Sequence, residues 1–486
     1  MTRRLRCLAV LGTAGALVAT ACSSSGARQD ARTQSPPSTA APTCAVERPP
    51  TATGTVKITV SEAFDARSEE AASLLVGQFN ASQTGVEVVL QHRTADASVE
   101  QQLTASDDHH RSPTLAVLDD IRTQAVADSG KVLPAQLCFK AAHTDLSSFM
   151  PAARTYYTVH DTLLALSANL TTPLLYFDHT AFKAAGLDPT KPPTTLDQVY
   201  ADAVKLKQAN PTTVPLAMKM SSWLVESWLT GAGNAIVNND NGRTAPADGS
   251  TFNSDHAVAI HQWLQKMYAS DLIDLVPDTP DQHAQDADLA TRRSAMLIDS
   301  SSAISDVAAL ELDTLDPTVW GLPATTVLPP AGPPIDVDVA PLPGLSEAGR
   351  GQVSGSAWYL SAAATPAQQA AAWTFMKWWN QPAQQVAWSL EGTYLPYNSQ
   401  AVSDAGLQAV WQHTQRGQWL DTAYTQITNV DTGSPGPLIG PYSAVRAAIV
   451  QSMSAVTQGD MDPAITVNET DSTIDADLVE YQLAHS

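Results

Sequence analysis

The alternation of strand and helix patterns after residue 55 constrains the fold of this chain most strongly. Short apolar runs at 56–60, 86–90 and 115–118 have the length of buried strands, and residues 68–79 and 99–104 between them have helical patterns. Strands separated by helices indicate a parallel sheet with helices on its faces. Ligands of such sheets sit beyond the carboxyl ends of the strands, so the residues after each strand are the candidates for binding.

A second informative stretch, 173–208, has an ordered series of local signals. Its apolar and aromatic residues 174–177 are too few for a helix core and suit a buried strand. A short helix over 179–185 is then closed by a glycine. After a proline-rich turn, Thr194 or Thr195 caps an amphipathic helix.

The order of these signals resembles the solute-binding proteins of bacterial ABC importers, in which a strand reading LYYN is followed by FKKAGLDP and PPKTW. The similarity is closest to the branch that binds glycerol-3-phosphate and its diesters, beside the larger sugar-binding branch. Further matching segments follow in the family's order: SAMLIDSSS at 294–302, VDVAPLP at 337–343, SGSAW at 354–358, GTYLP at 392–396 and GPLIGPYSAVR at 436–446.

The resemblance implies an α/β, two-lobed periplasmic-binding-protein-like fold of type II, with the ligand cleft between the lobes. The expected first lobe comprises 55–172 and 292–352, and the second 173–291 and 353–486. A chain of 486 residues is also too long for one ordinary core, which agrees with two lobes. Its formal net charge of −22 disfavours nucleic acid and anionic lipid headgroups as partners.

The N-terminus predicts export. Residues 1–21 combine basic residues, an apolar run and a small-residue end, as in a signal peptide. Cys22 follows directly and resembles the lipidated cysteine of a lipoprotein, with plain secretion as the alternative. Residues 22–54 are rich in Ser, Thr, Ala and Pro, so we expect a flexible tether. The protein would then be anchored to the outer face of the bacterial cell membrane.

Two cysteines remain once the signal is removed and Cys22 is modified. In an oxidising cell envelope Cys44 and Cys138 are expected to form a disulfide, with two unpaired buried thiols as the alternative. No metal and no cofactor are expected, because the acidic and histidine cluster at 107–110 lacks ligand spacing and looks like a solvated loop.

Candidate ligand-binding residues come from the strand ends, the crossovers between lobes and the aromatic loops of the resembling family. A polyol requires carboxylates and amides for its hydroxyl groups and an aromatic face for its C–H surface. The candidates are Phe64, Asp65, Asp119, Asp120, Thr171, Thr172, Trp223, Ser300, Ser301, Ser356, Tyr394 and Tyr442. Side chains alternate along an extended segment, so only one of Asp119 and Asp120 should point into the cleft. Each of these acids could instead be a solvated turn residue, and Trp223 a core residue.

One departure from the family pattern bears on the ligand. The phosphate-binding branch has an arginine within GLRLG, whereas the corresponding residue here is Leu438, and Arg446 matches a different, structural arginine. Phosphate usually requires a charge-assisted donor. The sequence therefore favours a neutral carbohydrate or polyol, with a glycerophosphodiester or glycerol-3-phosphate as the alternative.

The predicted function is an extracytoplasmic solute-binding lipoprotein, a monomer that delivers its solute to the transmembrane subunits of an ABC permease. It is not expected to be an enzyme, since the chain has no nucleophile elbow, zinc-protease or phosphate-loop motif. Two alternatives of other classes are a secreted glycoside hydrolase and a sensor or assembly protein with a degenerate cleft.

Overall fold

The computed structural model describes residues 42–49, 53–105, 107–279, 283–328, 330, 332, 335–392, 394–433 and 435–485. Residues Pro42–Ser486 form one compact unit. The predicted signal peptide, the lipidation of Cys22 and the first part of the tether lie outside the described residues. Among the described residues, none of the helices combines the length and apolarity that a membrane span requires.

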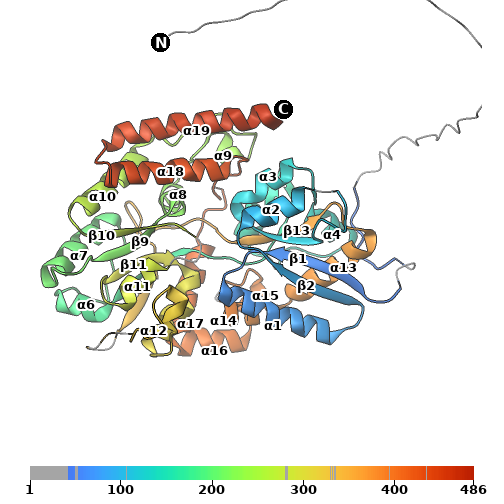
Figure 1. Ribbon diagram of the computed structural model, residues 1–486, viewed down its shortest axis with the longest axis horizontal. Coiled ribbons are helices and arrows are strands. Elements are labelled where there is room, and N and C mark those ends of the chain that lie inside the picture. The colour runs from blue at the N-terminus through green and yellow to red at the C-terminus, as the bar shows by residue number, and fades with distance from the viewer. Residues whose placement is uncertain are drawn as a thin grey trace, which may run out of the picture. The chain divides into compact units, whose positions relative to one another are not determined.

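The first sheet has the strand order β2-β1-β3-β13-β4, with β7 also paired to β13 (Figure 1). The strands are β1 (Val56–Glu62), β2 (Val86–His92), β3 (Leu115–Asp119), β4 (Val132–Leu133), β7 (Leu166–Ser167) and β13 (Ser356–Ser361). β1 is parallel to β2 and β3, whereas β13 runs antiparallel to β3. The predicted strand and helix alternation is thus confirmed in this part of the chain.

The second sheet has the order β10-β9-β11-β8-β12. The strands are β8 (Pro173–Asp178), β9 (Leu216–Met220), β10 (Ile273–Pro277), β11 (Met296–Ser300) and β12 (Val337–Pro341). All six residues of β8 are buried, as its apolar run predicts, because β11 and β12 pair with its two edges. A separate two-stranded ribbon joins β5 (Thr158–Val159) and β6 (Thr162–Leu163).

Helices cover both sheets, and their starts follow local sequence signals. Asp65 caps α1, Thr195 rather than Thr194 caps α7, and Thr365 forms a capping box on α13. The helices are α1 (Ala66–Ser82), α2 (Asp96–Thr104), α3 (Thr123–Asp128), α4 (Ala135–Ala141), α5 (Pro151–Tyr156), α6 (His179–Ala184), α7 (Leu196–Ala209), α8 (Ser222–Gly231), α9 (Asn238–Gly242), α10 (Asp255–Ala269), α11 (Ala284–Ala290), α12 (Ile304–Glu311), α13 (Pro366–Trp379), α14 (Pro382–Gly392), α15 (Ser399–Val402), α16 (Ala405–His413), α17 (Gln415–Thr428), α18 (Tyr442–Thr457) and α19 (Pro463–His485), with short 3-10 turns η1 (Asp120–Arg122), η2 (Ser301–Ala303) and η3 (Pro317–Trp320).

Each sheet and the helices packed on it form one lobe. In the first lobe α1, α2 and α13 pack on the sheet and α14 packs on α1. In the second lobe α10, α11, α17 and α18 pack on the sheet, and α19 packs on α18 (Figure 1). The α/β prediction is confirmed.

The predicted assignment of 292–352 to the first lobe was wrong. β11 and β12 belong to the second sheet, because β11 pairs with β8 and β9 and β12 pairs with β8. Likewise β13, which follows residue 353, returns to the first sheet rather than the second. The chain therefore crosses between the lobes from β7 to β8, from β12 to β13 and once more between α14 and α17, with no crossing near 292.

The second of these crossings depends on a glycine. Gly355 has a φ of +139°, and a Cβ added there would lie 2.3 Å from the carbonyl oxygen of Asn169. The two crossing segments therefore pass too closely for any other residue. The backbone N–H of Ser356 donates to Asn169 Oδ1 at 2.7 Å, which holds the segments together.

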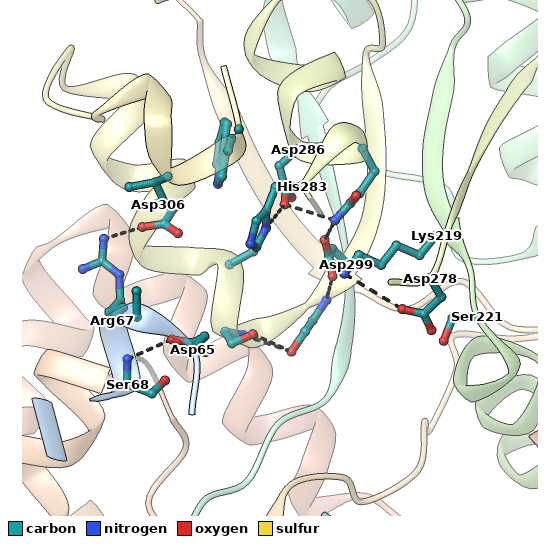
Figure 2. A pocket seen from close by; sticks show the side chains of 18 of the residues that line it. Asp65, Arg67, Ser68, Lys219, Ser221, Asp278, His283, Asp286, Asp299 and Asp306 are labelled. Atoms are coloured by element: carbon teal, nitrogen blue, oxygen red, sulfur yellow. Dashed lines mark hydrogen bonds and ion pairs between the residues drawn. The ribbon is translucent and has the colours of Figure 1, made fainter. Parts of the chain in front are cut away.

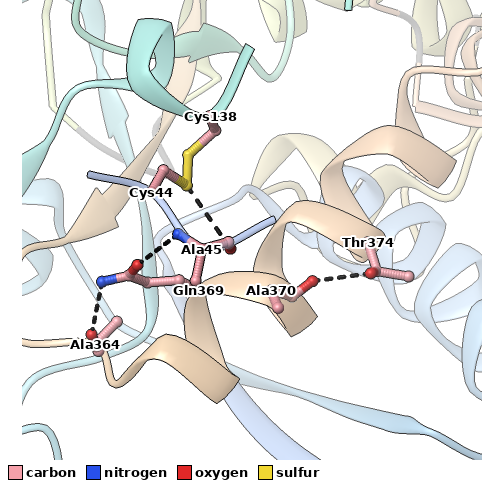
Figure 3. The surroundings of a disulfide bond; sticks show 7 residues. All are labelled: Cys44, Ala45, Cys138, Ala364, Gln369, Ala370 and Thr374. Atoms are coloured by element: carbon pink, nitrogen blue, oxygen red, sulfur yellow. Dashed lines mark hydrogen bonds between the residues drawn. A yellow bond between two sulfur atoms is a disulfide. The ribbon is translucent and has the colours of Figure 1, made fainter. Parts of the chain in front are cut away.

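A disulfide joins Cys44 and Cys138, the pairing expected from the sequence (Figure 3). Both cysteines are buried, and Cys138 lies in α4. The adjacent Ala45 N–H donates to the Gln369 side chain of α13 at 3.0 Å. Part of the predicted tether is thus fixed to the first lobe.

We expect the double substitution Cys44→Ala and Cys138→Ala to destabilise the chain from Ser23 onward. The bridge closes a sequence separation of 94 residues, and removing such a link costs about 2–4 kcal/mol in free energy of unfolding. The measurement is the denaturation midpoint in urea with and without reductant. Reductant should lower the midpoint of the unsubstituted protein and leave that of the double variant unchanged. Equal midpoints for both proteins without reductant would contradict the role of the bridge.

Candidate functional site

A cavity of about 780 Å³ lies between the two lobes (Figure 2). The first lobe contributes the start of α1, together with Gly392 at the end of α14. The second lobe contributes residues that follow the ends of β9, β10 and β11, with Trp320 from η3 and Arg446 from α18. The cavity therefore has the location that a ligand between two lobes requires.

The first-lobe wall is the N-terminal turn of α1. Asp65 accepts a hydrogen bond from the Ser68 N–H at 2.8 Å, which fixes its carboxylate over the helix start. One turn inward, the Ser68 hydroxyl donates to Tyr394 Oη at 3.1 Å. Arg67 projects across the cavity and forms an ion pair with Asp306 of α12, so the two lobes already have one contact through charged side chains (Figure 2).

The second-lobe wall is a chain of hydrogen-bonded acids and amides. His283 Nδ1 lies 2.9 Å from Asp286 Oδ2, and the Gln285 side-chain amide donates to Asp286 Oδ2 at 3.1 Å and to Asp299 Oδ2 at 2.8 Å (Figure 2). The Ser300 N–H in turn donates to Asp299 Oδ1 at 2.6 Å. α11 and the end of β11 are thus linked through side chains that face the cavity.

Burial and like charge shift the protonation of this wall. Burial, together with the charge of Asp299, raises the pKa of Asp286 to about 8. The hydrogen bond that the imidazole makes to Asp286 raises the pKa of His283. Near neutral pH the Asp286 carboxyl is therefore mostly protonated and neutral.

The cavity is acidic overall. Its lining includes the carboxylates Asp65, Glu70, Asp278, Asp286, Asp299 and Asp306. Three cationic side chains line it, and each already has a carboxylate partner: Arg67 pairs with Asp306, Lys219 with Asp278 at 4.0 Å, and Arg446 with Glu226 at 3.0 Å. A ligand anion would have to displace one of these pairs.

Two tryptophans supply aromatic surface. Trp223 of α8 and Trp320 of η3 both line the cavity. The indole N–H of Trp223 is buried and has no hydrogen-bond partner. Such a donor beside a cavity is available to an oxygen of a bound solute.

Three of the residues expected to bind ligand do line the cavity. They are Asp65, Trp223 and Ser300, and each follows or caps the element from which it was inferred. The remaining nine do not line it, and the contacts that hold them elsewhere fall into four groups.

The crossover residues hold the lobes together instead. The Ser301 N–H donates to the Thr172 carbonyl at 2.8 Å, and the Thr172 N–H donates to Ser301 Oγ at 3.2 Å. Thr171 pairs with Ser354 in an isolated bridge. Ser356 is buried at the start of β13. Most of the hydrogen-bonding groups of these residues bind other parts of the crossing segments. They are therefore not part of the cavity lining.

Two aromatic candidates support the wall from behind. The ring centroids of Phe64 and Trp388 are 5.7 Å apart, and Tyr394 stacks on Trp388 with a centroid separation of 5.2 Å. Tyr394 is 8% exposed and contacts the site through its hydrogen bond with Ser68. Both rings belong to the core of the first lobe because the indole of Trp388 buries them.

The adjacent acids were expected to place one carboxylate in the cleft, and neither lines it. Asp119 is exposed and raises the pKa of Asp96, whose own burial is the larger cause, to about 10. Asp120 is 3% exposed and accepts the Ile121 N–H at 2.8 Å. Burial raises the pKa of Asp120 to about 7, against the opposing charge of Arg446.

Tyr442 belongs to a buried network behind the cavity. Its hydroxyl donates to Glu226 Oε2 at 2.8 Å, and Arg446 binds the two oxygens of Glu226, each at 3.0 Å. Gln352 donates to the same hydroxyl at 3.3 Å. Arg446 was expected to be structural, and this bidentate pair gives it that role although its side chain also lines the cavity. Leu438 is 5% exposed and lies in the core, outside the cavity lining.

Sequence reasoning missed most of the second-lobe wall. The missed residues include Arg67, Lys219, Asp278, His283, Gln285, Asp286, Asp299 and Trp320. Asp299 and Lys219 lie at the ends of strands in the second sheet, so the strand-end rule applied to the first sheet would have found them. His283 and Asp286 belong to a short helix without a recognisable motif.

Two groups in the described residues bring carboxylate and imidazole atoms within 4.8 Å of one another. One is Asp108, His109 and His110, the loop already set aside, and the other is Glu62, Glu69 and His92. In the second group His92 Nδ1 lies 3.3 Å from Glu62 Oε2, which is the geometry of an ordinary histidine–carboxylate pair. Neither group lines the cavity.

Comparison with known proteins finds similarity to bacterial solute-binding proteins. The family model described as bacterial extracellular solute-binding protein matches residues 75–415. The sn-glycerol-3-phosphate-binding periplasmic protein UgpB of Yersinia pestis is 32% identical over 201 residues, and that of Escherichia coli K12 is 29% identical over 201 residues. Each match covers 40% of this chain and 45% of the relative, so the chain spans less than half of the relatives' length.

Solved structures share the fold across most of the chain. UgpB from Mycobacterium tuberculosis in complex with glycerophosphocholine has a TM-score of 0.68 at 16% identity, covering 89% of this chain and 100% of that one. The cyclic alpha-maltosyl-1,6-maltose binding protein from Arthrobacter globiformis has a TM-score of 0.66 at 18% identity, covering 87% and 99%. At these identities the likeness concerns the fold, and it confirms the two-lobed architecture.

We expect Asp120→Asn to change how stability depends on pH. A carboxyl whose pKa is about 7 in the folded protein, above its ordinary value of 3.8, keeps a proton that the unfolded chain loses. It therefore lowers stability as pH rises between about 4 and 7. The variant should gain on the order of 1–3 kcal/mol over the unsubstituted protein at pH 8 and much less at pH 5.

The measurement is the melting temperature at both pH values. The variant keeps the titratable groups that interact with Asp120, which are Asp119, Tyr156, Tyr157, Glu226, Arg243, Tyr359, Tyr442 and Arg446. Glu469→Gln, at an exposed position of α19, controls for the loss of one charge and should give the same difference at both pH values. A gain at pH 5 equal to that at pH 8 would show that Asp120 does not titrate in this range.

Proposed function

The chain belongs to the bacterial extracellular solute-binding proteins, and from this premise we propose that it captures a carbohydrate or polyol-like solute in the cavity between its lobes and delivers it to an ABC permease. Because the family is one of solute-binding proteins, the prediction that the chain is not an enzyme is confirmed. The alternative of a secreted glycoside hydrolase is thereby set aside.

The observation that carries the proposal is the chemistry of the cavity lining. Carboxylates, an amide and a serine hydroxyl supply hydrogen-bond acceptors and donors, and Trp223 and Trp320 supply aromatic surface. Each net hydrogen bond contributes only roughly 0.5–1.5 kcal/mol, so a specific polyol site needs several that converge. A cavity of about 780 Å³ has room for a mono- or disaccharide.

Closure of the lobes distinguishes the solute-bound state of such a protein from the solute-free state. Ligand contacts with both walls form only when the lobes approach, so the ligand favours the closed state by its differential contacts. Residues Asp65 and Ser68 on one wall and Asp299 and Ser300 on the other are placed for this role. The permease would then recognise the closed arrangement.

A glycerophosphodiester is the second candidate. It is favoured by the likeness to glycerol-3-phosphate-binding relatives and to a protein solved with glycerophosphocholine. It is disfavoured by the pairing of Arg67, Lys219 and Arg446 with carboxylates, because a phosphate needs a cation that is free to bind it. A sensor with a degenerate cleft is the third candidate, and the size of the cavity disfavours it.

We expect neutral sugars to raise the melting temperature of the protein from Ser23 onward, and glycerophosphodiesters to leave it unchanged. A ligand at 100 times its dissociation constant stabilises the folded state by about 2.7 kcal/mol, which is a shift of a few degrees. Trp223→Ala should weaken the sugar effect about tenfold or more in dissociation constant. Tyr268→Ala, on the outer face of α10, is the matched control and should keep it. A shift with the phosphodiester alone would establish the second candidate instead.

We also propose that residues 1–21 are removed and that a lipid on Cys22 anchors the protein, as a monomer, outside the cell membrane. Expression of Cys22→Ser in a bacterium that processes lipoproteins tests this. The unsubstituted protein should sediment with membranes and incorporate a labelled fatty acid, whereas the variant should do neither. Sedimentation and labelling that are identical in the two proteins would exclude Cys22 as the anchor.

A further inference from the structure

One end of the cavity holds buried acceptor atoms that no group of the described protein satisfies. Asp286 and Gln285 are each 1% exposed, and Asp286 Oδ1 and Gln285 Oε1 have no hydrogen-bond partner. Both side chains line the cavity (Figure 2). An unpaired buried acceptor costs free energy, so these atoms are left for a donor that the solute brings.

The same end also concentrates negative charge. Asp286 and Asp299 bind the one side-chain amide of Gln285 and therefore lie close together. Asp278 lines the same wall from the end of β10. Lys219 lies 4.0 Å from Asp278, and the ion pairs of the described residues include none between Lys219 and Asp286 or Asp299.

His283 does not complete the site. Its Nδ1 contacts Asp286 Oδ2, the oxygen that also accepts from Gln285, and the other oxygen of Asp286 stays unpaired. Burial and the charge of Asp299 raise the pKa of Asp286 to about 8, so in the empty protein a proton partly supplies the missing positive charge. A bound cation could replace that proton.

We propose that the solute carries a protonated amino group that binds between Asp286 and Asp299, so that the cavity prefers an amino sugar or amino polyol to its neutral counterpart. This inference rests on the proposed carbohydrate or polyol function. An ammonium group offers three donors and a positive charge, whereas a hydroxyl offers one donor and leaves both carboxylates uncompensated. Trp223 and Trp320 provide the apolar faces on which the remaining ring can lie.

The test compares two disaccharides that differ only in their amino groups. The probes are cellobiose and the corresponding β-1,4-linked glucosamine disaccharide, titrated calorimetrically at pH 6 and constant ionic strength. We expect the diamino sugar to bind about 10- to 100-fold more tightly, the range that charge-assisted hydrogen bonds supply. Asp286→Asn and Asp299→Asn should each reduce this preference to a few-fold.

Two controls separate the local effect from other causes. Glu469→Gln removes one charge from the exposed face of α19 and should keep the full preference. The melting temperature of empty Asp286→Asn should equal or exceed that of the unsubstituted protein near pH 8, because the variant no longer buries a charge, which also verifies that it folds.

Three results would overturn the inference. Cellobiose binding as tightly as the diamino sugar would do so while leaving the proposed function intact. Stabilisation by calcium chloride alone, lost in Asp286→Asn, would assign the acids to a metal ion instead. Binding of glycerophosphocholine with neither disaccharide bound would remove the proposed function and this inference together.

Discussion

The cavity depends on a small set of buried hydrogen bonds where the chain passes between its lobes. Thr172 and Ser301 exchange two of them, and Gln426 donates to Thr172 Oγ1 at 2.6 Å and to the Pro173 carbonyl at 2.7 Å. These bonds attach the first crossing, the end of β11 and α17 to one another. Because unpaired backbone groups here would be costly, these bonds hold the start of β8 firmly against the second lobe.

The strands could be predicted because the burial of a strand follows from the apolar residues of the strand itself. β8 is buried throughout and apolar up to its last residue, and β3 is apolar and buried up to its last residue. The pairing of one strand with another does not follow from the residues of either strand alone. An apolar run such as β11 or β13 fits a central position in either sheet, and only contacts with distant strands decide which one it joins. The lobe boundaries near residues 292 and 353 failed for this reason.

The site could be predicted only where position in an element fixes the direction of a side chain. Asp65 caps a helix that points at the cavity, and Ser300 ends a strand there, so both were found. Asp120 also follows a strand, but its carboxylate is buried near Arg446, whose main partner is Glu226 more than 200 residues away in sequence. A single sequence contains no local signal for such a contact.

The two walls of the cavity differ in what they contribute to closure. Arg67 and Asp306 already form an ion pair across it, which favours approach of the lobes whether or not a solute is present. Asp286 and Asp299 act in the opposite way, because two close carboxyl groups, one of them buried, keep an electrostatic and desolvation cost that a proton on Asp286 relieves only in part. A solute that neutralises the second wall therefore removes an unfavourable term as well as adding contacts. Such a solute stabilises the closed state by more than its contacts with Asp65 and Ser300 alone would supply.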